Sequence, residues 1–167
     1  AQSNAGWCTV TSGGTGNGAI TATYTANTEL SSRTATITVS ASGVSSQTVT
    51  VVQAGTSPTL TVSPSSQSVT AAAGTTNFTV TSNTTWTAQS NAGWCTVTSG
   101  GTGNGTITAT YTAHTELSSR TATITVSGNG ANSQTVTVVQ AGAAPALTVS
   151  PSSQSVTAAA GTTSFTV

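Results

Sequence analysis

Charged residues are almost missing from this chain. Its 167 residues include two basic and two acidic side chains, with no lysine and no aspartate, so only 2% are charged. A typical soluble domain carries about 25%. Nucleic-acid binding needs basic side chains against phosphates, and docking on an anionic membrane surface needs a basic patch. The sequence therefore excludes both kinds of partner, and Ser, Thr, Asn and Gln must hydrate the surface.

Side chains for catalysis and metal binding are equally scarce. Glu29 and Glu116 occupy equivalent positions of two repeats and cannot form the carboxylate pair of a glycosidase. His114 is the single imidazole that could activate a nucleophile, and its counterpart in the other repeat is Asn27. A zinc or calcium site needs more ligands than one repeat supplies. We expect no enzyme activity, no metal and no cofactor.

Long apolar runs are absent as well. No run approaches the roughly 20 residues of a membrane helix, so we expect no membrane insertion. No signal peptide is visible at Ala1, but Ala1 falls in the middle of a repeat. We therefore expect the natural start to lie upstream or to have been removed.

What the chain has instead is an internal repeat. Trp7-Cys8 recurs as Trp94-Cys95, and Gln53-Ala54-Gly55 recurs as Gln140-Ala141-Gly142, at a constant offset (94 − 7 = 140 − 53 = 87). A fixed period of this kind predicts an array of like modules. Residues 56–142 hold the one complete copy, whereas residues 1–55 match its back part and residues 143–167 its front part.

Within the repeat, threonines alternate with apolar residues. In residues 106–112, Ile107, Ala109 and Tyr111 share one face, and the threonines share the other. This period of two predicts half-buried strands, and no stripe of helical period accompanies it. The strands predicted in this way cover residues 60–62, 68–70, 77–80, 85–88, 95–97, 106–112, 121–126 and 134–139.

Gly, Pro, Asn and Ser separate these strands and predict turns at residues 63–66, 99–105 and 128–130. Seven or eight short strands in each period describe a β-sandwich of immunoglobulin-like size. The predicted fold class is all-β, with tandem immunoglobulin-like β-sandwiches on an 87-residue repeat (94 − 7 = 87). The core is expected to consist of aliphatic side chains around Phe78, Trp86 and Tyr111.

The two partial copies should have open edges. Residues 1–55 would form the back part of a first sandwich, residues 56–142 a complete one, and residues 143–167 the front strands of a third. The last segment stops before the counterpart of residues 81–87. Either the chain is a window on a longer array, or the front strands of one chain complete the back strands of the next. A head-to-tail contact that does not close on itself builds a filament.

The order of several motifs resembles a BACON domain, an immunoglobulin-like module of Bacteroidota surface proteins. The motifs are Thr85-Trp86-Thr87, Trp94-Cys95-Thr96-Val97, Arg120-Thr121-Ala122-Thr123-Ile124 and Val138-Val139-Gln140-Ala141-Gly142. The resemblance implies an extracellular β-sandwich, often in tandem, beside carbohydrate-active or adhesive modules. The family's name suggests carbohydrate binding, although many members look like spacers. Cys95, where an aliphatic residue is usual, and the loss of charge depart from the family.

Trp7 and Trp94 are the candidate carbohydrate-binding residues. Alternation turns them away from the faces of Cys8 and Cys95, and a flat indole can stack on a sugar ring. The other interpretation, which we favour, is an aromatic lid over the rim of the sandwich.

Cys8 and Cys95 are expected to be small buried hydrophobic residues, with interchain disulfides as the alternative. A bond between them within one chain would need Cα atoms within about 7 Å, which equivalent points of successive modules do not offer. Glu116 and Arg120 are expected to form a local surface ion pair.

Two functions follow from these expectations. The first is a structural one: an extracellular stalk or filament of tandem modules, whose partners are other copies of the chain arranged head-to-tail. The alternative is a carbohydrate- or mucin-binding array that gains avidity from repetition. Exposure of Trp94 would favour the second function, and its burial would favour the first. Both place the protein outside the cell or at its surface.

Overall fold

The computed structural model describes residues 1–11 and 13–167, and these residues contain strands and no helix. The all-β prediction is confirmed. No helix among these residues could cross a bilayer. The strands are β1 (Gln2–Ser3), β2 (Cys8–Val10), β3 (Ala22–Tyr24), β4 (Arg33–Val39), β5 (Gln47–Gln53), β6 (Leu60–Ser63), β7 (Ser66–Val69), β8 (Gly74–Ser82), β9 (Thr85–Ser90), β10 (Cys95–Val97), β11 (Gly100–Thr102), β12 (Gly105–Tyr111), β13 (Arg120–Gly128) and β14 (Gln134–Gln140).

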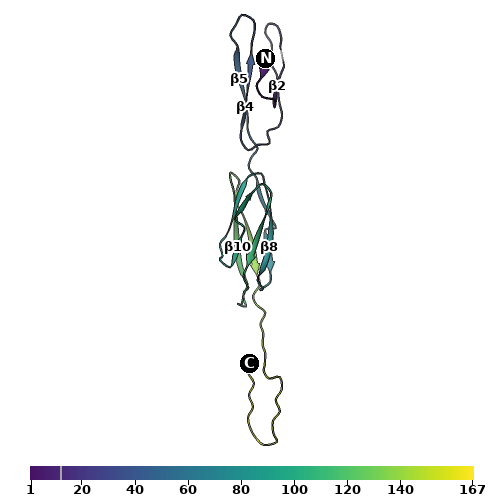
Figure 1. Cartoon of the computed structure of the whole chain (residues 1–167), viewed down its shortest axis with the longest axis vertical. Coiled ribbons are helices and arrows are strands. Elements are labelled where there is room, and N and C mark those ends of the chain that lie inside the picture. The colour runs from purple at the N-terminus through teal and green to yellow at the C-terminus, as the bar shows by residue number, and fades with distance from the viewer. Residues whose placement is uncertain (12) are drawn as a thin grey trace.

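The central unit, formed by β6 to β14, is a β-sandwich (Figure 1). One sheet has the order β10-β12-β8-β6, and the other has the order β11-β9-β13-β14-β7. All neighbouring strands in these two sheets are antiparallel except β7 and β14, which pair in parallel. The predicted sandwich is therefore confirmed, and its second sheet is mixed.

The core lies between these two sheets and follows the threonine alternation. Phe78, Trp86 and Tyr111 are all buried, as predicted, among aliphatic side chains of both sheets. Along β13, Ala122, Ile124 and Val126 are fully buried while the threonines between them face outward. Burying the apolar half of each strand is the dominant favourable term in the folding of such a sheet.

One predicted turn is partly wrong. Within residues 99–105, Gly100–Thr102 forms the short strand β11, which pairs with β9 so that Gly101 lies opposite Trp86. A Cβ on Gly101 would lie 2.9 Å from Cζ2 of that indole. The glycines therefore let the backbone approach the ring closely, which a rule that assigns glycines to turns does not anticipate.

Residues 1–55 form two smaller sheets, β1-β4-β5 and β2-β3. These strands repeat parts of β9, β13 and β14, and of β10 and β12. Figure 1 shows them at one end of the chain, beyond the central unit. Their sheets lack the neighbours that β6, β7, β8 and β11 provide in the central unit.

Residues 143–167 form a long loop closed by one antiparallel bridge between Ser150 and Thr166 (Figure 1). Their sequence repeats β6, β7 and most of β8, yet they form no strand here beyond that bridge. Isolated strands are unstable without neighbours that cover one face. That these residues are the front strands of a further sandwich stays a prediction.

Candidate functional site

Each copy of the repeat holds an arginine stacked on a tryptophan. In the central unit, Trp94 lies just before β10, half-buried against the core, and the Arg120 guanidinium carbon is 4.2 Å from the centre of its ring. In the first unit, Arg33 lies 4.3 Å from the ring of Trp7. Such cation–π contacts contribute about 0.5–1 kcal/mol at exposed sites and more where they are desolvated.

A buried glutamine holds this arginine in place. The Nε of Arg120 donates to Oε1 of Gln140 at 2.9 Å, and its Nη2 donates to the Thr112 carbonyl at 2.9 Å. Gln140 has no exposed surface, and its Nε2 donates to the carbonyls of Ala71, Ala72 and Thr112. The amide thus ties β14 to the β7–β8 loop and to the end of β12.

The first unit contains part of this hydrogen-bond network, namely the bonds that do not involve the β7–β8 loop. Nε of Arg33 donates to Oε1 of Gln53 at 2.9 Å, and Nε2 of Gln53 donates to the Thr25 carbonyl at 2.9 Å. Gln53 is half-buried, whereas Gln140 is fully buried. The two additional carbonyls that Gln140 reaches belong to the loop between β7 and β8, which has no counterpart in residues 1–55.

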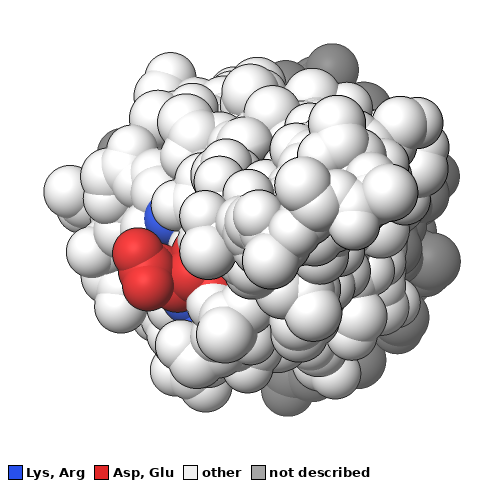
Figure 2. All heavy atoms as spheres, turned by 90° about the horizontal axis from the view of Figure 1, so that it is seen from below, with Lys and Arg blue, Asp and Glu red and all other residues white. Residues whose placement is uncertain are grey.

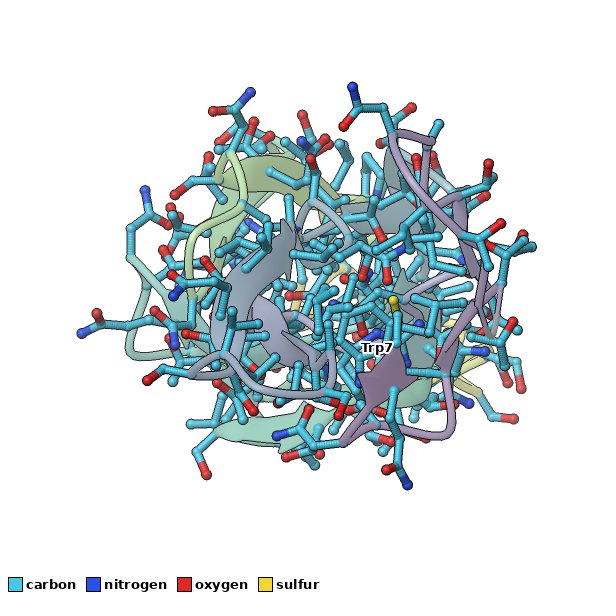
Figure 3. The ribbon with its side chains drawn as sticks, turned by 90° about the horizontal axis from the view of Figure 1, so that it is seen from above. Trp7 is labelled. Carbon is cyan, nitrogen blue, oxygen red and sulfur yellow. The ribbon has the colours of Figure 1, made fainter. Side chains whose placement is uncertain are left out.

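The surroundings of Trp7 and Trp94 determine whether these two side chains could bind a carbohydrate. One face of each ring lies under a guanidinium, and Trp94 also packs against the core cluster. In Figure 3, Trp7 lies inward of the outermost side chains. Stacking on a sugar requires an open ring face. The arrangement therefore favours the interpretation that each tryptophan covers the rim of its sandwich. Sugar binding by either residue stays a prediction.

The Arg120 guanidinium is engaged by Trp94, Gln140 and Thr112, and the described residues form no ion pair between Arg120 and Glu116. The expected local ion pair is therefore wrong. The guanidinium instead donates to Gln140 and to the carbonyls of Thr112 and Ala113, and it stacks on the ring of Trp94. Seen from below, the surface is uncharged apart from one small group of acidic and basic residues (Figure 2).

His114 has a structural contact. Its Nε2 donates to the Ser118 carbonyl at 2.7 Å, and the Asn27 amide makes the equivalent bond to Ser31 at 2.9 Å. Both side chains close the same loop in their respective copies. Within residues 1–11 and 13–167, no three potential metal ligands lie together.

The cysteines are buried and unpaired, in agreement with the expected small hydrophobic role. Burial raises the pKa of the Cys95 thiol above the usual 9.0, although a hydrogen bond from Ser90 and the charge of Arg120 act in the opposite direction. A protonated and inaccessible thiol is unreactive.

We expect Cys8 and Cys95 to resist alkylation in the native chain and to react once it is unfolded.

Because the pKa of the Cys95 thiol is raised in the folded chain, the contribution of this buried thiol to stability is complete below about pH 9. The contribution is lost as pH rises and the thiol of the unfolded chain ionises. Urea unfolding at pH 7 and pH 10 measures this loss. Cys95→Ala should show a smaller decline between the two pH values, and an equal decline would contradict the assignment.

Several large apolar side chains of the two partial copies are exposed although their counterparts in the central unit are buried. Tyr24 is 59% exposed and its counterpart Tyr111 is 8% exposed; Phe165 is 49% exposed and its counterpart Phe78 is 1% exposed. The same contrast separates Ile20 from Ile107, Val49 from Val136, Leu147 from Leu60 and Val167 from Val80. Exposed apolar patches of this kind mark interaction surfaces.

The family model described as "Viral BACON domain" matches residues 59–143, a little over half of the chain. The chain belongs to the BACON family. A second model of this family, described as "Putative binding domain, N-terminal", matches residues 1–54. The family predicted from the motifs is thereby confirmed for this BACON chain.

Solved structures similar to this BACON chain come from two Bacteroides species. A Bacteroides ovatus GH5 xyloglucanase in complex with an XXXG heptasaccharide is 25% identical, with 53% of this chain and 20% of that one covered and a TM-score of 0.49. A protein from Bacteroides thetaiotaomicron is 17% identical, with 47% and 77% covered and a TM-score of 0.38. The chain thus spans about a fifth of the xyloglucanase. No curated protein matches it.

Proposed function

We propose that this protein is a structural component of an extracellular stalk or filament, built from tandem BACON units that are completed by strands of neighbouring copies. The observation that carries the proposal is the matched exposure described above. Several apolar side chains that are buried in the core of the central unit lie exposed at the same positions of residues 1–55 and 147–167, namely Ile20, Tyr24, Val49, Leu147, Phe165 and Val167. Each partial copy offers the surface that the other one covers in the complete unit.

The central unit supplies the geometry of this contact. There, β8 pairs with β12 and places Phe78 opposite Ile107, while β7 lies beside β14. Residues 147–167 repeat residues 60–80 with one exchange, Ser164 for Asn77. In the proposed contact, Phe165 of one copy faces Ile20 of the next. Main-chain hydrogen bonds would supply affinity, as in other strand-addition complexes.

The backbone path by which the chain leaves each unit is the same in both copies, and this supports a regular arrangement of units in a rod. The Ala143 amide donates to the Glu116 carbonyl at 2.8 Å, and the Thr56 amide makes the equivalent bond to Glu29 at 2.8 Å. A Cβ on Gly142 would overlap the Leu117 carbonyl. The linker therefore leaves both units along the same fixed path. Near-zero net charge also weakens the repulsion between neighbouring units.

Sedimentation velocity and electron microscopy of the 167-residue chain test the proposal. We expect mass to rise with concentration and linear particles to appear. Phe165→Asp should block the donor end and Ile20→Asp the acceptor end, so each variant alone should stay monomeric. An equimolar mixture should form a 1:1 dimer that grows no further, because each variant keeps one intact end. The matched control, Leu117→Asp, alters an exposed leucine outside both surfaces and should assemble normally.

A wild-type chain that stays monomeric at every concentration would refute strand exchange between copies. Assembly that survives both aspartate substitutions would show that other surfaces carry it.

Carbohydrate binding is the alternative function, and membership of the BACON family is the observation that supports it. Under this alternative, Trp94 would contact the sugar despite the guanidinium on its ring. A glycan array with mucin-type and plant glycans would then show binding that Trp94→Ala removes. We expect no such binding, because the indole is already covered by Arg120.

A further inference from the structure

The central unit contains a seat for one tryptophan side chain. Trp86 is 4% exposed, and its Nε1 donates to the Gly103 carbonyl at 2.9 Å. Built Cβ atoms on Gly101 and Gly105 would lie 2.9 and 2.8 Å from Cζ2 of the ring. The wall of the seat is thus bare backbone, and any side chain on these two residues would collide with the indole.

The first unit repeats this wall. Gly13–Gly18 has the same sequence as Gly100–Gly105, and Gly16 has φ of 70° where Gly103 has 68°. Here, however, built Cβ atoms on Gly14 and Gly18 meet nothing within 4 Å. A cavity of about 400 Å³ lies in this place, lined by Gly14, Gly18, Ile20, Val39 and Ala41.

The backbone around the cavity defines what can fill it. In the central unit, the strand that carries Trp86 is held between two others, with Trp86 opposite Gly101 of β11 and opposite Gly128 of β13. The counterparts of these two residues are Gly14 and Ala41, which both line the cavity. An occupant that is an extended strand can therefore bond to both walls while its indole enters between them.

We propose that the Gly13–Gly18 loop is a binding seat for a tryptophan on an extended strand of a partner polypeptide, with threonines on either side of the indole. The proposal goes beyond assembly of the chain. The donor residues 147–167 contain no tryptophan, so the strand exchange proposed above does not itself supply an indole to this seat. Burial of one aromatic side chain together with paired strand edges gives affinity and register at once.

The probe is a synthetic peptide with the sequence of residues 81–87, in which the indole carries a 5-fluoro group. Fluorine NMR then reports the peptide alone, despite the three tryptophans of the chain. Titration with the 167-residue chain should give a shifted signal that saturates. Gly14→Val should weaken binding at least about tenfold, because the new side chain overlaps the ring position.

Gly14→Val is a clean variant, since its Cβ meets nothing in the free chain. The matched control is Gly6→Val, which also meets nothing within 4 Å and lies outside the cavity lining. It should bind like the wild type. A shift that Gly14→Val leaves unchanged would overturn the proposal.

A second experiment tests the proposal even if so short a peptide binds too weakly to be detected. The same seven residues, with fluorinated tryptophan, are joined directly before Ala1. The fluorine signal should differ from that of the urea-unfolded chain and should return to it in the Gly14→Val background. If the signal matches that of the unfolded chain in native buffer, the seat does not accept an indole and the proposal fails.

Discussion

Phe78→Ala is expected to lower the free energy of unfolding of the central unit by about 3–5 kcal/mol, the usual cost of deleting a buried phenylalanine. Phe78 is 1% exposed, and it lies opposite Ile107 at the centre of the sheet formed by β8 and β12. Removing the ring leaves a cavity that rigid strands cannot close. Urea unfolding followed by intrinsic tryptophan fluorescence, to which buried Trp86 contributes, measures the loss.

The chain contains its own matched control for this change. Phe165 occupies the equivalent position of the last segment and is 49% exposed. Phe165→Ala should leave the unfolding of the central unit unchanged within about 0.5 kcal/mol, as for a surface substitution. Equal losses for the two variants would show that residues 143–167 are already packed within one chain.

Gln140→Ala is expected to destabilise the central unit by about 2–3 kcal/mol, because buried polar groups lose their partners. The fully buried amide donates to three carbonyls and accepts from the Arg120 guanidinium. Its loss should also release Arg120 from the ring of Trp94. Thermal unfolding measures the first effect, and the near-ultraviolet circular dichroism of the indole measures the second.

Gln53→Ala serves as the control for this prediction. Nε2 of Gln53 donates to the Thr25 carbonyl, and this amide lacks the bonds to the β7–β8 loop that Gln140 makes. We expect no measurable change in the central unit. If Gln140→Ala proved as mild as Gln53→Ala, the glutamine would not connect the sheets in the way described.

Much of the fold could be predicted from the sequence, because the alternation of threonine with apolar residues has the period of a strand. The burial of Phe78, Trp86 and Tyr111 followed from the same pattern. The short strand Gly100–Thr102 could not be predicted, since glycines favour turns unless a large side chain lies against them. The parallel pairing of β7 with β14 was also missed, because a local pattern carries no information about the direction of a distant neighbour.

The tryptophan sites were anticipated only in part. Alternation separates Trp94 from Cys95, but it does not show that Arg120, 26 residues further along (120 − 94 = 26), stacks on the ring. One signal could have found this contact: Trp, Arg and Gln recur together in both copies, at Trp7, Arg33 and Gln53. The seat in the first unit was missed because it becomes visible only when the surroundings of Gly101 and Gly14 are compared in space.

Amide hydrogen exchange of the dilute chain tests the central claim most directly, namely that the partial copies await further protein. The account predicts strong protection of Arg120–Gly128 and Gln134–Gln140, and weak protection of their counterparts Arg33–Val39 and Gln47–Gln53. Protection of the counterparts and of residues 147–167 should rise together at assembling concentrations. Equal protection of both pairs of strands in the dilute monomer would contradict the account.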